Sequence, residues 1–455
     1  MPHDELVPSE QQIYGWIEKV FAQGIRRPAY PANRWAEQFC LQSFRDFGLE
    51  NVRLEAVELP SWEPQNWSLV AWSSTDQTIE LSCFPLPHAA PTADLQAEIV
   101  DFNPEHPEQV KGRIALYDVR LSRLPHAGLA GRATWCYDPD DSFNGSTQVL
   151  PFGRDVQAVM EPSIAAGAVA FVGSLSDYPS DSHDYYVPYD AVARPIPGVW
   201  IRGSDGDQLR EMMLERPIHA RITVEAIRQM VTTHNVVGEL SGADEELVII
   251  GSHHDGPWAS AVEDGSGIAL VLAQAAYWSR VPRQERPHRL VFLLNSGHMA
   301  GGAGVHAFIH AHRAELARTV LEVHLEHAAS ECIEQNGRLT PTAQPEARWW
   351  FTSRVPHLEA AVQAAIQAED LRRSMILPPT IFGPQPTTDG GPFHLEGVPL
   401  VNFLTAPFYL FDSQDTLDKI HRASLVPVTR AAIRILESTE HMTAESMRAA
   451  ALANG

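Results

Sequence analysis

The chain has 455 residues, 44% of them hydrophobic and 20% charged, which is long enough for two or three domains and too apolar for disorder. Its formal charge of −23, from 34 basic and 57 acidic residues, opposes binding to nucleic acid or to an anionic membrane surface. The N-terminal residues lack the pattern of a secretory signal, and no apolar run reaches about 20 residues. We therefore expect a cytoplasmic protein without membrane contact.

The first 93 residues are predicted to begin with two helices. Ser9 is a typical cap for a helix that reaches Phe21, and a second helix is expected from about Asn33 to Gly48. Alternating apolar residues after Gly48 predict a strand. Residues 60–93 are rich in Pro, Trp and Ser and give only a weak signal.

Residues 94–226 form short apolar strands separated by turns. Ile114–Tyr117 and Pro195–Ile201 are two of these strands, and Ser204 begins a capped helix. No cluster of potential ligands occurs in this stretch, so we expect a non-catalytic module here.

From His234 onward the pattern is α/β. Continuous apolar runs predict strands that are buried on both faces of a parallel sheet. They are Leu247–Ile250, Leu290–Leu294, Val320–Leu325 and Val398–Leu404, with helices expected over 268–278 and 304–318 between them. His253, Asn295 and Glu326 each follow a predicted strand, and ligands gather at such strand ends in an open α/β sheet.

Four motifs carry a family resemblance. They are Gly251-Ser252-His253-His254-Asp255, Asp264-Gly265-Ser266-Gly267, Thr388-Asp389-Gly390-Gly391-Pro392-Phe393 and Asp415-Thr416-Leu417-Asp418-Lys419-Ile420. In this order they resemble the motifs of the co-catalytic zinc aminopeptidases, a family that includes glutamate carboxypeptidases. The resemblance implies a mixed, mostly parallel α/β sheet flanked by helices. It divides the chain into 1–93 and 227–455, which form the metallopeptidase-like part, and 94–226, which resembles a β-rich protease-associated domain.

The resemblance also assigns roles to individual residues. It makes His253 a metal ligand and Asp255 the residue that orients its imidazole ring and assists catalysis. Asp264 takes the place of the carboxylate that bridges two metals, and Glu326 stands where the family has an aspartate ligand. Homodimers are common among relatives with the inserted module, so a homodimer is compatible with the resemblance.

The second metal position departs from the family pattern. Gly297 replaces the general-base glutamate, His298 replaces the adjacent carboxylate ligand, and Phe411 replaces the last histidine ligand. Because no Asp or Glu lies between Arg289 and Val305, shifting the alignment does not restore the base. A single ion held by His253, Asp264, His298 and Glu326 is the remaining expectation. Zinc suits this set best, with iron and manganese as alternatives.

Neighbouring residues have alternative interpretations. Strand alternation predicts that His254 and His327 turn away from the metal and are structural, with a role as a base from a neighbouring wall as the alternative for either. Glu263 is either a solvated neighbour or a substitute base. As a design test, we expect Gly297→Glu with His298→Glu and Phe411→His to restore a second metal.

Three functions are compatible with these residues. The first is a mononuclear-metal enzyme that acts on a small-molecule substrate, by hydrolysis of an amide-like bond or by another metal-assisted step such as the elimination of a lyase. The second is a slow aminopeptidase that relies on metal-bound hydroxide. The third is a non-catalytic binding protein with a relic site. Loss of a general base alone removes about 10²–10⁴-fold in rate, which disfavours ordinary peptidase chemistry.

Overall fold

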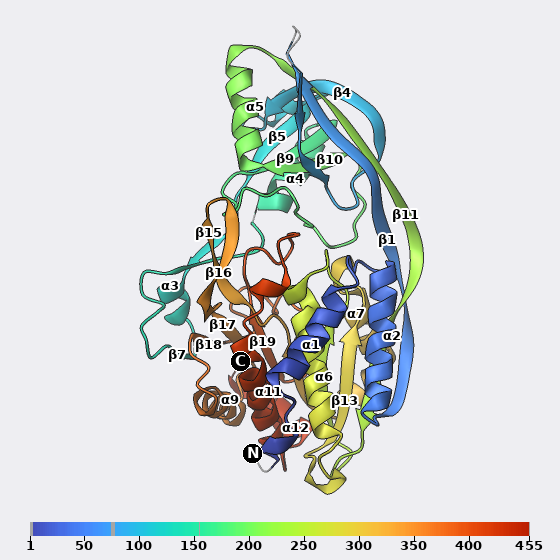
Figure 1. Cartoon of the computed structure of the whole chain (residues 1–455), viewed down its shortest axis with the longest axis vertical. Coiled ribbons are helices and arrows are strands. Elements are labelled where there is room, and N and C mark those ends of the chain that lie inside the picture. The colour runs from blue at the N-terminus through green and yellow to red at the C-terminus, as the bar shows by residue number, and fades with distance from the viewer. Residues whose placement is uncertain (1–2, 74–77, 154, 455) are drawn as a thin grey trace.

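The computed structural model describes residues 3–73, 78–153 and 155–454. Figure 1 shows a lower lobe, which contains most of the helices, and an upper lobe built mainly of strands. The long strands β1 (Glu50–Trp72) and β11 (Ile218–Leu240) pair antiparallel and run along one side of both lobes. One sheet of 15 strands therefore continues from the upper lobe into the lower lobe.

The sheet of the lower lobe is mixed and mostly parallel, which confirms the predicted fold class. β12 pairs parallel with β13 and β14, and β14 pairs parallel with β19, whereas β11 and β17 join this group antiparallel. The strand order is β11-β13-β12-β14-β19-β17-β18-β7. The bounds are β12 (Leu247–His253), β13 (Arg289–Asn295), β14 (Thr319–Leu325), β17 (Arg348–Thr352), β18 (Ser374–Leu377) and β19 (Leu400–Thr405).

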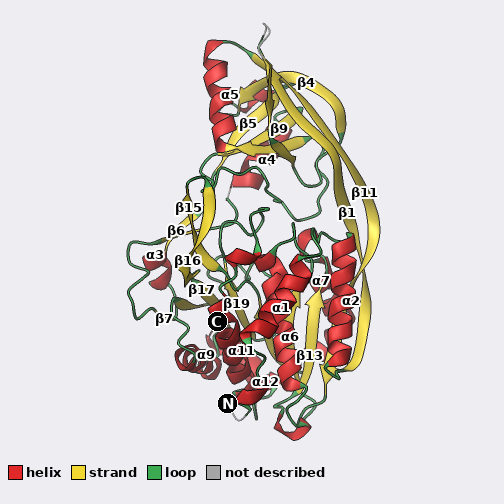
Figure 2. Ribbon diagram, in the orientation of Figure 1, coloured by secondary structure: helices red, strands yellow, loops and turns green. Residues whose placement is uncertain are grey.

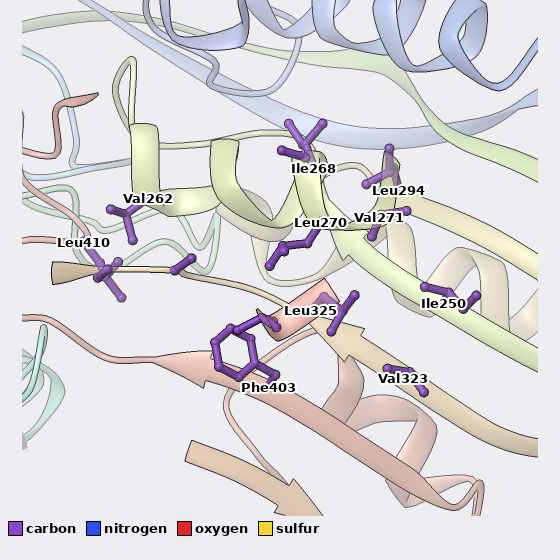
Figure 3. Packing of buried hydrophobic residues seen from close by; sticks show 14 of the residues in the cluster. Ile250, Val262, Ile268, Leu270, Val271, Leu294, Val323, Leu325, Phe403 and Leu410 are labelled. Atoms are coloured by element: carbon purple, nitrogen blue, oxygen red, sulfur yellow. The ribbon is translucent and has the colours of Figure 1, made fainter. Parts of the chain in front are cut away.

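Helices cover both faces of this sheet, because successive apolar side chains of a strand point to opposite faces. Val248 and Ile250 of β12 pack in one apolar cluster, and Leu247 and Ile249 pack in another. Figure 3 shows the first cluster, where residues of α6 lie above the central strands. The helices are α1 (Glu10–Phe21), α2 (Pro31–Asp46), α6 (Gly267–Trp278), α7 (Ala303–Ala311), α8 (Arg313–Leu316), α9 (Pro356–Ala368), α10 (Gly390–Leu395), α11 (Arg422–Glu437) and α12 (Ala444–Asn454).

The upper lobe has its own apolar core beneath a smaller sheet. Its strands follow the order β3-β10-β9-β5-β4 and continue into β11. Figure 2 shows the two helices of this lobe, α4 and α5, beside the strands. The bounds are β2 (Thr78–Leu81), β3 (Cys83–Pro85), β4 (Thr92–Asp101), β5 (Ile114–Val119), α4 (Asp155–Ala165), β9 (Ala170–Leu175), β10 (Gly198–Arg202) and α5 (Gly203–Glu215).

A segment between β5 and α4, residues 120–152, leaves the upper lobe and covers part of the lower one; we call it the cap. Its strand β7 extends the lower sheet by pairing antiparallel with β18. Its strands β6 and β8 pair with each other. The cap elements are β6 (Arg123–Pro125), α3 (His126–Ala130), β7 (Trp135–Tyr137) and β8 (Thr147–Val149). The predicted boundaries at 93/94 and 226/227 fall inside β4 and β11, and the division into three parts stays a prediction.

Several local expectations differ from the structure. The helix expected over 304–318 is divided into α7 and α8 at His312, whose backbone angles (φ −108°, ψ 18°) leave the helical region. The weakly patterned residues 60–72 continue β1, because β11 supplies hydrogen bonds along that whole length. A hairpin of β15 (Ser330–Gln335) and β16 (Arg338–Pro345) stands beside the sheet. Among the described residues, no helix combines the length and apolarity needed to cross a membrane.

Candidate metal centre

Three neighbouring parallel strands deliver the polar residues of the site to one end of the sheet. β12 ends at His253, β13 is followed by His298, and β14 is followed by Glu326 and His327. Glu263 lies on the turn that leads from β12 into α6. Because parallel strands end at the same edge, these side chains converge.

A buried carboxylate lies among three imidazole rings; we call His253, Glu263, His298 and His327 the histidine–glutamate cluster. Glu263 Oε1 is 3.4 Å from His253 Nε2 and 3.8 Å from His298 Nε2. Glu263 Oε2 is 2.5 Å from His327 Nε2. Ligand atoms of His253, Glu263 and His327 lie within 4.8 Å of one another, which is close enough to hold one ion.

The backbone fixes which nitrogen of two rings faces the carboxylate. His253 Nδ1 donates to the carbonyl oxygen of Asp255 (3.0 Å), and His327 Nδ1 donates to that of Thr405 (2.9 Å). In the neutral rings both Nε2 atoms are therefore lone pairs that face Glu263. Neither these Nε2 atoms nor the two Glu263 oxygens find an aligned hydrogen-bond donor or acceptor among the described residues.

Acceptors that face a buried carboxylate require a proton or a metal ion between them. Burial lowers the pKa of His253 well below its usual range; burial also acts to lower the pKa of His327, but the neighbouring carboxylates, Glu263 first, together raise it to about 10. Imidazole Nε2 atoms with Nδ1 bonded to a backbone carbonyl, together with a carboxylate, are the donor set of a divalent metal. The residues present thus fit the metal that the sequence predicts.

His298 is held by a second carboxylate. Its Nδ1 lies 2.8 Å from Asp389 Oδ1, and its ring stacks on that of His253 with centroids 4.1 Å apart. Burial alone would lower the pKa of His298, but Asp389 and then Glu263 raise it to about 10. A carboxylate behind a histidine fixes the ring and makes its other nitrogen a better ligand.

Asp255 connects two loops of the site. Its carboxylate accepts the backbone N–H groups of His298 (3.1 Å) and Met299 (2.8 Å). The His253 ring is hydrogen-bonded to the backbone carbonyl oxygen of Asp255, because the Asp255 carboxylate is 3.8 Å from His253 Nδ1. Asp255 therefore orients His253 and His298 together.

Asp264 and Glu263 have different surroundings, although they are adjacent. The Asp264 carboxylate accepts the Ser252 hydroxyl and the N–H of Gly267 (2.9 Å), where α6 begins. Its nearest oxygen is 3.9 Å from His253 Nε2, farther than that of Glu263. Glu263 is therefore better placed than Asp264 to bind an ion, and the role that the sequence assigns to Asp264 stays a prediction.

Glu326 lines the same pocket but is bonded to a buried polar chain. Its Oε1 accepts from His324 Nε2 (2.9 Å), and His324 Nδ1 lies 2.9 Å from Glu322 Oε1. Burial raises the pKa of Glu326, but the hydrogen bond and charge of His324 outweigh it and lower the value to about 2. Glu326 is therefore an anionic residue that lines the site. Metal ligation by Glu326 stays a prediction.

Two distant residues fix the backbone of Glu263. The Asp415 carboxylate accepts the N–H groups of Val262 and Glu263, both at 2.8 Å. Arg26, which is fully buried, donates to the carbonyl oxygens of Ser260 (2.9 Å) and Glu263 (3.2 Å). Asp415, from the Asp415–Ile420 motif, therefore holds the loop that carries Glu263. The position of the motif in the sequence did not reveal this role.

The positions that the resemblance assigns to a second metal hold a glycine and a phenyl ring that pack against their neighbours. Gly297 has a φ of +76°, and a Cβ added there would lie 2.7 Å from Leu59 Cδ2 and 3.2 Å from Ala303 Cβ. A side chain at 297 would therefore point toward β1 and α7. The Phe411 ring stacks on Tyr189 (4.8 Å), and Tyr189 stacks on His298 (5.4 Å). This geometry disfavours the expected return of a second metal in the variant with Gly297→Glu, His298→Glu and Phe411→His, which stays a prediction.

His254 and His327 show where strand alternation stops being informative. His254 does turn away, since its Nε2 lies 2.8 Å from the carbonyl of His234 and its Nδ1 lies 3.0 Å from Asn33 Nδ2. The same prediction for His327 is wrong. β14 ends at Leu325, and His327 has a φ of +32°, which rotates its ring back toward Glu263.

A cavity of about 560 Å³ opens above the cluster. Its floor is polar, with Glu263, His298, Glu326 and His327, and its walls are mostly apolar. Tyr189, from the upper lobe, completes the wall next to His298. The apolar and aromatic lining residues are Leu124, Leu150, Pro151, Phe152, Trp349, Phe351, Ile381, Phe382, Leu404, Ala406, Leu410 and Phe411. Such a pocket suits a small organic molecule.

Comparison with known proteins agrees with this scaffold. Residues 235–436 match the model of Peptidase family M28. No curated protein matches the chain in sequence.

Three solved structures share the fold over nearly their whole length. A peptidase M28 precursor from Shewanella amazonensis SB2B is 18% identical, with 94% of this chain and 93% of that one covered and a TM-score of 0.70. An aminopeptidase from Aneurinibacillus sp. strain AM-1 is 17% identical (97% and 96% covered, TM-score 0.64). A zinc aminopeptidase from Bacillus subtilis is also 17% identical (94% and 95% covered, TM-score 0.65). The chain thus has a metallopeptidase scaffold with aminopeptidases among its structural neighbours.

Proposed function

We propose that this chain is a hydrolase that binds one divalent metal ion and cleaves an amide-like bond of a small molecule. His253, Glu263 and His327 hold the ion, and His298 lies beside them. The observation that carries the proposal is that the Nε2 atoms of His253 and His327, whose Nδ1 atoms are hydrogen-bonded to backbone carbonyls, converge with the buried Glu263 carboxylate within 4.8 Å. Zinc is the first choice of metal, since the nitrogen and oxygen ligands suit it.

The metal, when bound, supplies Lewis acidity toward the bond to be cleaved and favours ionisation of water at neutral pH. The protein supplies the rest. Asp389 holds the Nδ1 proton of His298, so that His298 Nε2 faces the floor of the pocket. Glu326 keeps a negative charge on that floor, and this charge orients hydrogen-bond donor groups of the substrate. The apolar walls exclude water from the bond, as required for electrostatic effects to be strong.

The proposal of one ion rests on the residues at the second metal position. Phe411 and Gly297 offer no ligand atom, and the stack of Phe411, Tyr189 and His298 fills the space beside the cluster. A dinuclear mechanism with a glutamate base is the chemistry that this arrangement disfavours. The fold likeness to aminopeptidases favours one second candidate, a slow aminopeptidase.

Metal titration combined with a substrate panel tests the proposal. Metal-free protein, prepared with a chelator, is titrated with Zn²⁺, Fe²⁺ or Mn²⁺ and assayed on simple aryl amides. We expect about one ion per chain and turnover that disappears after chelation and returns with the ion. No bound ion, two bound ions, or turnover that continues after chelation would contradict the proposal. Cleavage of leucine 4-nitroanilide but not of its N-acetyl form would select the aminopeptidase.

A further inference from the structure

One wall of the pocket is made of three aromatic rings; we call Trp349, Phe351 and Phe382 the aromatic wall. Trp349 and Phe351 stand on the same face of β17, two residues apart, with ring centroids 6.2 Å apart. Phe382, from the loop after β18, lies 5.4 Å from Trp349 and 6.2 Å from Phe351. Phe382 is 43% exposed and lines the cavity, so it lies where the cavity meets solvent.

The cap forms further apolar lining. Leu124 lies in β6, and Leu150 and Phe152 follow β8. All three line the cavity together with the aromatic wall. Leu124 and Leu150 also pack against the apolar cluster that contains Trp349 and Phe351. The pocket is therefore lined by aromatic rings from the sheet and by apolar side chains from the cap.

The aromatic wall contains one polar atom without a partner. Trp349 is 4% exposed, and its Nε1 has no hydrogen-bond acceptor among the residues that the structure describes. Two other buried tryptophans have acceptors: Trp350 Nε1 donates to Ser374 Oγ (3.3 Å), and Trp200 Nε1 donates to the Val187 carbonyl (3.0 Å). The buried Trp62 Nε1 also lacks an acceptor, but Trp62 does not line this cavity. A buried donor without an acceptor is destabilising, so its presence in a pocket wall indicates that a ligand supplies the acceptor.

Polar groups occur in two separate parts of the cavity lining, so a matching ligand has a polar group at each of its two ends. Glu263, Glu326 and the histidines are at the floor, whereas the Trp349 N–H belongs to the apolar wall. The volume of about 560 Å³ is within the usual range for a small organic ligand. Aromatic rings favour stacked or edge-to-face contact with a flat ligand over contact with a saturated one.

We propose that the pocket selects a planar aromatic compound whose ring lies on the aromatic wall and whose hydrogen-bond acceptor takes the N–H of Trp349. This inference rests on the proposed function for the claim that the bond to be cleaved lies at the histidine–glutamate cluster. The ring positions that bond, and the acceptor fixes the orientation of the ring. Substrates of the protein are then aromatic amides or related aryl compounds that carry a second polar group.

Equilibrium binding to the metal-free, full-length protein tests the proposal without any turnover. The probes are 4-acetylbenzamide (the benzamide), 4-acetylcyclohexanecarboxamide (the cyclohexanecarboxamide) and toluene, measured by calorimetry; the acetyl oxygen is the second acceptor. We expect benzamide to bind about 3- to 10-fold more tightly than cyclohexanecarboxamide, because only the former is aromatic. Trp349→Phe, which keeps a ring and removes the N–H, should weaken benzamide about 5- to 10-fold and leave toluene unchanged.

Trp350→Phe is the matched control, since Trp350 stands on the opposite face of the same strand and does not line the pocket. It should leave benzamide affinity unchanged within about twofold. Equal affinities for benzamide and cyclohexanecarboxamide, an unchanged benzamide affinity in Trp349→Phe, or no binding of any probe would each overturn the proposal. Because the experiment uses metal-free protein, absence of a metal or of hydrolysis would contradict the proposed function and leave this result intact.

Discussion

Glu263→Gln should abolish tight metal binding and also destabilise the metal-free protein. Glu263 is the carboxylate that lies within ligand distance of both His253 and His327. Loss of a residue that merely orients a ligand costs 10- to 100-fold in metal affinity, so loss of the ligand itself should cost about 100-fold or more. In the metal-free state Glu263 is also the main charge that raises the pKa of His327 to about 10, so its loss breaks a buried ion pair and should cost about 3 to 5 kcal/mol of stability at neutral pH.

Asp264→Asn is the matched control for that substitution. Its carboxylate accepts from Ser252 and from the N–H of Gly267, and an asparagine oxygen still accepts one of these bonds. We expect its metal affinity to fall by less than about 10-fold. Isothermal titration with zinc and urea denaturation of both metal-free variants give the two quantities. If Asp264→Asn loses the ion and Glu263→Gln keeps it, the roles of the two carboxylates are the reverse of those we propose.

Gly297→Glu should lower the free energy of unfolding by about 2 to 6 kcal/mol and return no base to the site. Placing a non-glycine residue at φ +76° costs about 1 to 3 kcal/mol. The contact of the new Cβ with Leu59 Cδ2, at 2.7 Å, adds an overpacking cost of about 1 to 3 kcal/mol. The triple variant with His298→Glu and Phe411→His should bind no second ion, since the glutamate would point toward β1.

Two alanine substitutions separate the two costs. Gly337 has the same φ of +76° as Gly297, but nothing lies within 4 Å of a Cβ added there. Gly337→Ala therefore reports the backbone cost alone, and Gly297→Ala reports that cost plus the contact with Leu59. Equal losses in urea denaturation, or two bound metals in the triple variant, would contradict the prediction that a side chain at 297 points toward β1.

The fold of the lower lobe could be predicted because its strands are continuous apolar runs. Leu247–Ile250 and Leu290–Leu294 are unambiguous in sequence, and parallel strands with intervening helices leave few possible arrangements. The path of β1 beyond residue 60 could not be predicted, because its prolines and polar residues give no alternation. Its pairing with β11, about 160 residues away, determines that conformation. For the same reason, the pairing of the cap strand β7 with β18 has no local signal.

At the site, the loops that come together could be predicted from the sequence. Which of their side chains face the histidine–glutamate cluster could be predicted less reliably. His253 and the loop of Glu263 and Asp264 were found because they follow β12. Which of these two carboxylates faces His253 depends on Asp415 and Arg26, which hold the backbone on either side of Glu263. His327 was assigned to the wrong side, because alternation does not extend past the end of a strand. Tyr189 was missed altogether, since it comes from a different lobe.

A diffraction measurement at the zinc absorption edge, on crystals of the full chain soaked with zinc, tests the central claim most directly. The structure predicts one anomalous peak within ligand distance of His253 Nε2, His327 Nε2 and the Glu263 carboxylate, and no peak beside Phe411. An empty cluster in crystals that have taken up zinc elsewhere, or two peaks a few ångströms apart at the strand ends, would contradict it.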